Sequence, residues 1–393
     1  MKIRFKLIVL LLYFTGSVFT QSTLDQLLDQ VQNNNKSLQA EKYRIAASKA
    51  FFQTGLSIND PAVNLDWMRG FPSSAGNQTD LTIAQAFDYP TSYKFRRQVA
   101  ALKTEQTDFE YNLLRRNVLL ESKLIALHLI YLNKQKLELV NRQAEAERFL
   151  ANYQKKLEQQ EVTVLDVNKA RLRLVNLQTD LQLLESDVTN NLQKLSGLNG
   201  GSPVVFKDTI YPQLPTFPGF ETLEKIIEEN DPILNYLQKQ RQIGDADFNL
   251  TKALLLPKFE AGYRYQGILG QQFHGIHTGV TIPLWENKKR LNFADSQRKA
   301  YDSQIEEHRI DHFHEMKRLY ERQIAYRQNL EDYRVKLRLI SNSTLLDKAL
   351  QSGQLTVLEY FMETTLYYES IDRYMALEES LHKIAAELLK YQL

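Results

Sequence analysis

The sequence contains no cysteine, and this absence removes several kinds of chemistry at once. A chain without cysteine forms no disulfide, binds no metal through thiolates and offers neither a thiol nucleophile nor a site for an N-terminal lipid. A glycine-rich phosphate loop and a nucleophile elbow are also missing from the sequence. We therefore predict that the protein is not an enzyme and that it needs no cofactor.

An excess of charge of one sign is missing as well. The chain carries 49 basic and 47 acidic residues, which leaves a formal net charge of +2. A balance this close to zero gives no general attraction to polyanions. We expect no nucleic-acid partner.

Glycine and proline, which interrupt helices, are scarce. The chain has 15 Gly and 10 Pro among 393 residues, with none between Pro90 and Gly197 and only Gly353 after Pro283. Such tracts are predicted to be helical, and a helix from about Tyr93 to Lys156 would be about 95 Å long. Their apolar residues recur at alternating spacings of three and four, as in the seam of a coiled coil: Leu174, Leu177, Leu181, Leu184 and Val188, or Leu330, Tyr333, Leu337 and Ile340.

The N-terminus has the pattern of a secretory signal peptide. Lys2, Arg4 and Lys6 precede an apolar run from Leu7 to Phe14, and small and polar residues follow it. The run is short for a membrane-spanning helix. We expect residues 1–20 to be a signal peptide of an exported protein; the alternative is an uncleaved membrane anchor.

The rest of the chain consists of an internal sequence repeat with two copies. "TLDQLLDQVQNNNKSL" from Thr23 resembles "TLEKIIEENDPIL" from Thr222, and an offset of 196 residues aligns Pro61 with Pro257. A Gly- and Pro-rich stretch lies between the copies. We predict two repeats, 21–196 and 222–393, that are joined by a linker, 197–221.

A short phrase also recurs inside the two helical tracts. "QEVTVLD" spans 160–166 and "GQLTVLE" spans 353–359. Gly353 can adopt the left-handed conformation that ends a helix, and the closing acidic residue suits the first turn of a new helix. We predict that each phrase is the tip of a long helical hairpin; the alternative, stronger for the first phrase because Gln160 replaces the glycine, is one continuous helix.

Four segments alternate between apolar and polar residues and are predicted to be strands, at about 62–71, 79–89, 258–268 and 274–285. In the third, Phe259, Ala261, Tyr263 and Tyr265 share one face. Each segment is close to the 9–11 residues that cross a bilayer, and aromatic residues lie near the ends. We therefore expect two hairpins of membrane strands, and several copies of the chain must combine because four strands cannot close a barrel. The alternative is a soluble sheet packed on a core.

The order of helix, proline-led strand hairpin and long helical hairpin with a "G-x-x-T-x-L-[DE]" tip, repeated, resembles the TolC-type outer-membrane efflux channels. The similarity covers about residues 23–393. It implies a mainly α fold with a β-barrel part, in which a homotrimer forms a 12-stranded barrel in the outer membrane of a Gram-negative bacterium and an α-helical tunnel across the periplasm.

The resemblance also implies a mechanism and partners. The channel would be the passive exit duct of a tripartite efflux system, with an inner-membrane pump of RND, ABC or MFS type, a periplasmic adaptor (membrane fusion) protein and outer-membrane lipid as partners. The adaptor would dock on the tips, whose residues are Gln160, Val162, Thr163, Val164, Leu165, Gly353, Leu355, Thr356, Val357 and Leu358.

Asp166 and Glu359 are the candidates for an acidic ring at the pore constriction, which would favour cations. The alternative is that both only start helices. We find no basic residue in the second tip that would lock Asp166 in an ion pair.

His308 and His312 are four residues apart on a predicted helix and are the candidates for a metal site, with Glu307, Asp311 and His314 nearby. A solvated helix face is the alternative, and we predict no metal.

A second class of function uses the same long helices. A soluble periplasmic coiled-coil adaptor or scaffold would bind partners with its hairpin tips and conduct nothing. We favour the channel because the predicted strands carry Lys258, Glu260 and Arg264 on one face and no obvious helix covers the other.

Overall fold

The computed structural model describes residues 23–285, 288–340 and 343–393, so the predicted signal peptide lies outside the described residues. The first half of the chain contains α1 (Thr23–Asn34), α2 (Lys36–Phe52), β1 (Ala62–Met68), β2 (Gln78–Phe87), α3 (Pro90–Glu158) and α4 (Val164–Leu198). The second half contains α5 (Phe220–Glu229), α6 (Pro232–Ala253), β3 (Lys258–Ile268), β4 (Gln271–Thr281), α7 (Lys288–Ile340), α8 (Ser343–Gln351) and α9 (Val357–Leu388).

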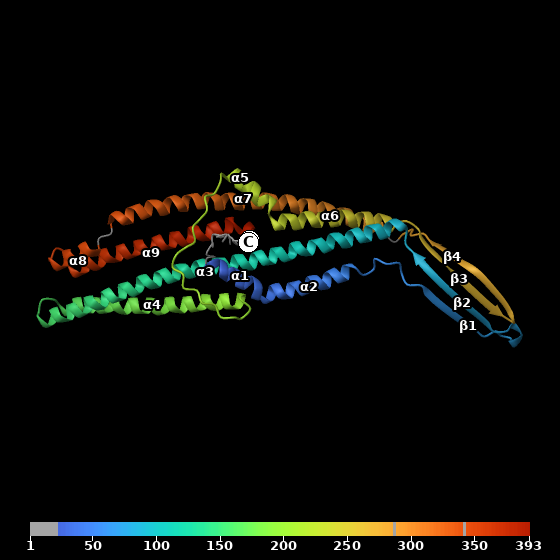
Figure 1. Ribbon diagram of the computed structural model, residues 1–393, viewed down its shortest axis with the longest axis horizontal. Helices are drawn as coiled ribbons and strands as arrows, with labels where there is room; N and C mark the ends of the chain where they lie inside the picture. Colours follow the sequence, from blue (N-terminus) through green and yellow to red (C-terminus); the bar gives the residue numbers. More distant parts are fainter. Residues whose placement is uncertain (1–22, 286–287, 341–342) are drawn as a thin grey trace, which may run out of the picture.

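The molecule is a long rod because its helices lie nearly parallel to one another. Helix α3 alone has 69 residues, which corresponds to about 100 Å at the helical rise. Figure 1 shows the sheet at one end of the rod, the α3–α4 and α8–α9 turns at the other, and α1, α5 and the C-terminus near the middle. Within the described ranges, no helix has both the length and the apolar character needed to cross a membrane.

Both halves break their first helix at equivalent residues. The side chain of Asn35 accepts a hydrogen bond from the Leu38 amide at 3.0 Å and caps α2, while the side chain of Asp231, 196 positions later, accepts one from the Ile233 amide at 2.9 Å and caps α6. The offset that aligns the two halves in sequence therefore also aligns their helix starts.

The core lies where the helices cross the middle of the rod. Leu127, Leu129 and Ile130 of α3 are almost fully buried in one apolar cluster. Phe206, from the segment between α4 and α5, is 2% exposed and belongs to the same cluster. The connecting segment is thus packed against the helices and crosses them (Figure 1).

The four strands form one antiparallel sheet in the order β1-β2-β3-β4. Strands β2 and β3, from different halves, pair along their length from Gln78–Ile268 to Phe87–Phe259. The register places four apolar residues in one row across the sheet: Val63, Ile83, Tyr263 and Ile276. Val63 is 64% and Ile276 86% exposed, so the apolar face is uncovered in the single chain.

Three strands end at other residues than predicted. Strand β1 stops at Met68 rather than near 71, and β2 spans 78–87 rather than 79–89. Strand β4 spans 271–281 rather than 274–285, because the β3–β4 turn needs only Leu269 and Gly270, both with positive φ, and because Pro283 follows the strand. The sequence does not reveal this short turn because leucine rarely adopts positive φ.

Candidate functional site

The first helical hairpin turns at Gln160. Helix α3 ends at Glu158, and Gln160 has a φ of 63°, in the left-handed region. The amides of Gln160 and Glu161 then donate to the carbonyls of Leu157 and Lys156, both at 2.9 Å, which is the Schellman pattern of helix termination. The predicted hairpin is therefore present, and a continuous helix is not.

The second hairpin turns in the same way at Gly353. Its φ is 74°, and the Gln354 amide donates to the Ala349 carbonyl at 2.9 Å. Gln160 and Gly353 are 193 positions apart and adopt the same backbone conformation. The position of Gln160 favours glycine, yet the turn has the same backbone conformation with glutamine there.

Asp166 and Glu359 close the two turns as helix-capping residues. The Thr163 hydroxyl accepts a hydrogen bond from the Asp166 amide at 3.3 Å, and the Asp166 carboxylate accepts one from the Thr163 amide at 3.2 Å. Thr356 and Glu359 make the same reciprocal pair at 3.2 and 2.8 Å. Both are capping boxes, so each acidic residue has a structural role at its helix start.

These hydrogen bonds also keep both carboxylates charged. The side-chain hydrogen bond from Thr163 is the main cause that lowers the pKa of Asp166, and Lys169, 3.5 Å away, adds to it. The backbone amide of Thr356 is the main cause that lowers the pKa of Glu359. Two negative charges therefore lie at the end of the rod at neutral pH.

Apolar side chains surround these charges and face solvent. Val164 is 60%, Leu165 70% and Leu358 55% exposed, whereas Val162, Leu355 and Val357 are half-buried. Figure 1 places the α3–α4 turn and the α8–α9 turn at the same end of the molecule. The structure thus brings the predicted tip residues of both phrases to one end.

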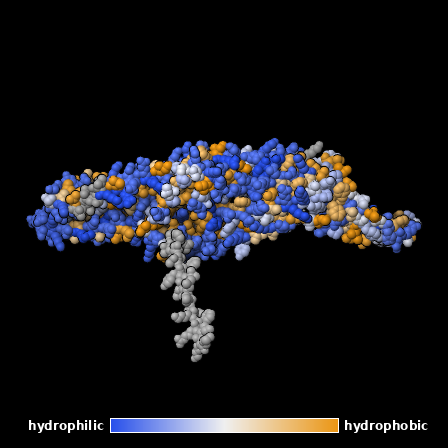
Figure 2. Space-filling model, turned by 45° about the horizontal axis from the view of Figure 1, so that its top comes forward, coloured by the Kyte–Doolittle hydropathy of each residue, from blue (hydrophilic) through white to orange (hydrophobic). Residues whose placement is uncertain are grey.

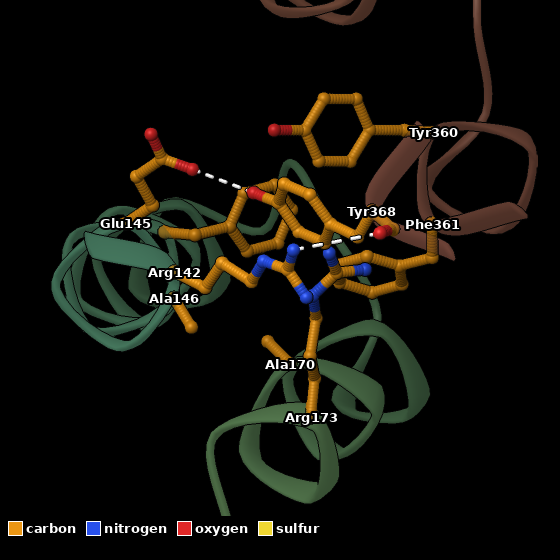
Figure 3. Close-up of a pocket in the computed structure, with 9 residues that line it drawn as sticks. Arg142, Glu145, Ala146, Ala170, Arg173, Tyr360, Phe361 and Tyr368 are labelled. Carbon is orange, nitrogen blue, oxygen red and sulfur yellow. Dashed lines mark hydrogen bonds between the residues drawn. The ribbon is translucent and has the colours of Figure 1, made fainter. Parts of the chain in front are cut away.

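An arginine–aromatic cluster, which we define as Arg142, Glu145, Phe149, Arg173, Tyr360, Phe361 and Tyr368, joins the two hairpins above the tips (Figure 3). The Tyr368 hydroxyl of α9 donates to Glu145 of α3 at 2.6 Å. The guanidinium of Arg142 lies 4.3 Å from the centre of the Tyr368 ring and forms a two-point ion pair with Asp372 at 3.0 and 2.8 Å.

The second half of the cluster rests on α4. The guanidinium of Arg173 lies 5.0 Å from the centre of the Phe361 ring and 5.4 Å from that of Tyr368. Phe149 stacks on Tyr360 at 5.4 Å. Helices α3, α4 and α9 are thus held together by stacked rings and guanidinium groups, contacts that are strong when shielded from water.

A groove of about 360 Å³ runs below this cluster, between α3 and the α8–α9 hairpin. Arg148 and Lys156 of α3 line one side, and Leu350 and Tyr367 line the other. Such a groove, lined by both apolar and charged side chains, suits the insertion of an amphipathic helix of a partner.

His308 and His312 lie elsewhere, near the middle of the rod. Their Nε2 atoms are 2.5 and 3.9 Å from the same Asp231 carboxylate oxygen, and the other oxygen lies 3.8 Å from the Arg116 guanidinium. Burial lowers the pKa of His312. The nearby Arg116 cation opposes a metal ion, and among the residues that the structure describes no three His, Asp or Glu side chains are grouped to hold one.

Sequence reasoning identified the tips but missed the arginine–aromatic cluster. Its partners lie far apart in the chain, with Glu145 and Tyr368 separated by 223 residues. A signal was present in the run "EYFMETTLYYESIDRY" from Glu359, where aromatic residues crowd a helix that a simple coiled coil would fill with aliphatic ones.

No family model matches the chain, and no curated protein matches it. Solved structures do match. CusC, described in terms of transmembrane channel formation, aligns with a TM-score of 0.80 at 12% identity over 95% of this chain and 92% of its own.

Two further structures agree. The outer membrane channel CmeC of Campylobacter jejuni has a TM-score of 0.76 at 13% identity, over 94% of this chain and 85% of its own. The outer membrane protein VceC of Vibrio cholerae has a TM-score of 0.78 at 13% identity, over 94% and 95%. The predicted resemblance is thereby confirmed for the fold: nearly the whole chain is folded as in the TolC-type outer-membrane channels.

Proposed function

We propose that the protein is the passive exit duct of a tripartite efflux system in the outer membrane of a Gram-negative bacterium. The observation that carries the proposal is the uncovered apolar face of the four-stranded sheet at one end of a rod about 100 Å long. Figure 2 shows hydrophobic surface gathered near this end, whereas the tip end is mainly hydrophilic. Lipid would cover the face that no part of the described chain covers.

The sheet edges support an assembly of several copies. Strands β1 and β4 each have one neighbour in the single chain, so each leaves an unpaired edge. Exposed edges tend to pair with other strands in water and are costly in lipid, and pairing β4 of one copy with β1 of the next would satisfy both edges. The likeness to TolC-type channels supplies the number three, so that a homotrimer closes a 12-stranded barrel above a helical tunnel.

The tips are the proposed docking surface for a periplasmic adaptor. The exposed Val164, Leu165 and Leu358 and the groove between the hairpins offer apolar contacts, and an inner-membrane pump of RND, ABC or MFS type would deliver the substrate. The arginine–aromatic cluster would hold the α8–α9 hairpin on α3 and α4 in a closed tip. Asp166 and Glu359 would add an acidic ring at the constriction, in addition to capping their helices.

The soluble adaptor is not favoured. The structural neighbours are outer-membrane channels and not adaptors, and each aligns over 85% or more of its own length. An adaptor would also bury the apolar face of its sheet, and here that face stays exposed.

Conductance across a planar lipid bilayer tests the proposal. We expect the purified full-length protein to produce discrete conductance steps, and the Tyr368→Phe, Arg142→Gln variant to conduct more because the closing contacts to Glu145 and Asp372 are lost. A protein that enters the bilayer without conducting would refute the proposed duct. Equal conductance of the wild type and the variant would show that the arginine–aromatic cluster does not hold the channel closed.

A further inference from the structure

We propose that basic residues at the base of the sheet form a binding band for anionic phospholipid headgroups of the membrane leaflet that faces the helices. The basic band is defined as Lys94 and Arg97 of α3 with Lys289 and Arg290 of α7. The inference rests on the proposed placement of the sheet in a membrane. It goes beyond that placement by naming a lipid class and the residues that select it.

Basic residues outnumber acidic ones at this level of the molecule. The stretches 90–98, 249–258 and 288–294 contain eight basic and no acidic residues, and the acidic residues that flank these stretches are Asp88, Asp247, Glu286 and Asp295. The starts of α3 and α7 and the end of α6 all lie beside the sheet (Figure 1). Three segments distant in sequence therefore bring positive charge to one level.

The four side chains of the band are exposed and form no ion pair within the described residues. Their neighbours Arg96 and Lys258 are already engaged by the buried Asp88. Asp247 of α6 is a nearby acidic residue whose charge interacts with Arg290 and Lys103. Burial raises the pKa of Asp247 and so disfavours its charged form.

The helix termini strengthen the positive potential. The N-terminal ends of α3 and α7 carry the positive ends of their dipoles, where acidic residues are normally preferred. Neither helix has an acidic residue in its first turn. Basic residues at these positions are unfavourable for the isolated helices, and an external anion would offset that cost.

The depth of the band matches a headgroup layer. Lys94 and Arg97 lie about 5 Å apart along the axis of α3, and the headgroup region of one leaflet is about 5–8 Å thick. Exposed aromatic residues flank the band, since Trp285 is 87% and Phe293 67% exposed. Aromatic rings beside flexible basic side chains are the usual anchors of a membrane interface.

The chain contains two tryptophans, which serve as probes at the two ends of the sheet. Trp285 adjoins the band, whereas Trp67 pairs with Thr79 at the far end of β1. The full-length protein would be reconstituted in two kinds of phosphatidylcholine vesicle. One contains a fraction of brominated phosphatidylglycerol, and the other contains the same fraction of brominated phosphatidylcholine. The bromine, placed near the headgroup end of the acyl chain, quenches nearby tryptophan fluorescence. A Trp67→Phe variant reports Trp285 alone, and a Trp285→Phe variant reports Trp67 alone.

We expect phosphatidylglycerol to be enriched around Trp285 by about fivefold over phosphatidylcholine, the factor expected for one basic residue at an anionic surface. No preference is expected around Trp67. The variant Lys94→Gln, Arg97→Gln, Lys289→Gln, Arg290→Gln should abolish the preference at Trp285. The variant Lys289→Gln, Arg290→Gln should weaken the preference, whereas the matched control Lys317→Gln, Arg318→Gln, which removes two charges on the same helix about 40 Å from Arg290, should keep it.

Equal quenching of Trp285 by the two lipids, or a preference that survives in the band variant, would overturn the inference while leaving membrane insertion intact. If neither lipid quenched either tryptophan, the sheet would not be inserted, and the proposed function would fail together with the inference.

Discussion

At the scale of single residues, the two hairpin tips show how different side chains build one geometry. Gln160 and Gly353 both hold a left-handed backbone, and Thr163 and Thr356 both cap the next helix. Gly353 does so without steric cost, whereas Gln160 carries a Cβ into a region that costs about 1 kcal/mol. The first tip is therefore the more strained of the two.

This strain predicts opposite effects for two exchanges. Gln160→Gly should stabilise the first turn by about 0.5–1 kcal/mol, and Gly353→Gln should destabilise the second by a similar amount, because only glycine adopts the left-handed backbone freely. Amide hydrogen exchange at the tips measures both effects. Faster exchange in Gln160→Gly than in the wild type would contradict the assignment of strain.

The acidic capping residues permit a separation of charge from structure. In the variant Asp166→Asn, Glu359→Gln the side-chain oxygen that accepts from the capping threonine amide remains, but two negative charges per chain are lost. We expect the cation preference in single-channel recordings to fall, while the amides at the two helix starts stay protected from hydrogen exchange. Unchanged selectivity would leave Asp166 and Glu359 with the capping role alone.

At the scale of elements, the sequence predicted those parts of the fold that rest on local patterns. The absence of breakers predicted the long helices, and the recurring phrase predicted both turns. The β3–β4 turn was missed because Leu269 is not a turn residue by type. The arginine–aromatic cluster was missed because its geometry arises only when α9 packs against α3, and no local pattern records that contact.

The two faces of the sheet should respond differently to charge. Ile276→Arg places a cation on the uncovered apolar face at the middle of β4, which costs about 2–4 kcal/mol in a bilayer. The neighbouring His277 lies on the polar face, where its Nε2 is 3.2 Å from a carboxylate oxygen of Glu260, and an arginine in the His277→Arg variant can keep this contact. We expect only Ile276→Arg to reduce the inserted fraction in a vesicle-flotation assay; equal insertion of both would exclude lipid contact at this face.

The segment between α4 and α5 should be sensitive to acid where it packs on α9. Tyr211 stacks on His382 at a ring distance of 4.3 Å, and burial, with a further effect of Lys134, lowers the pKa of His382 to about 4. Because the unfolded chain binds this proton below about pH 6.5 and the folded chain does not, stability falls as the pH drops from about 6.5 to 4, by up to roughly 3 kcal/mol.

A His382→Gln variant supplies the control, since glutamine does not titrate. The loss of Tm between pH 7 and pH 5 should be smaller in this variant than in the wild type. Identical losses would show that the proton on His382 does not contribute to the acid sensitivity.

At the scale of the whole molecule, features at the two opposite ends of the rod point to one assembly. An uncovered apolar face with two open edges lies at one end, and hairpin tips with a few exposed apolar side chains and acidic caps lie at the other. The single chain leaves both unsatisfied. A homotrimer in a membrane, met by a partner at its tips, would satisfy both.

The mass and outline of the detergent-extracted protein, from light scattering and single-particle images, test this claim most directly. We expect a trimer that is a hollow cylinder longer than about 100 Å, as the rise along α3 requires. A monomer or dimer that stays soluble without detergent would contradict it, because the apolar face of the sheet would then never meet lipid.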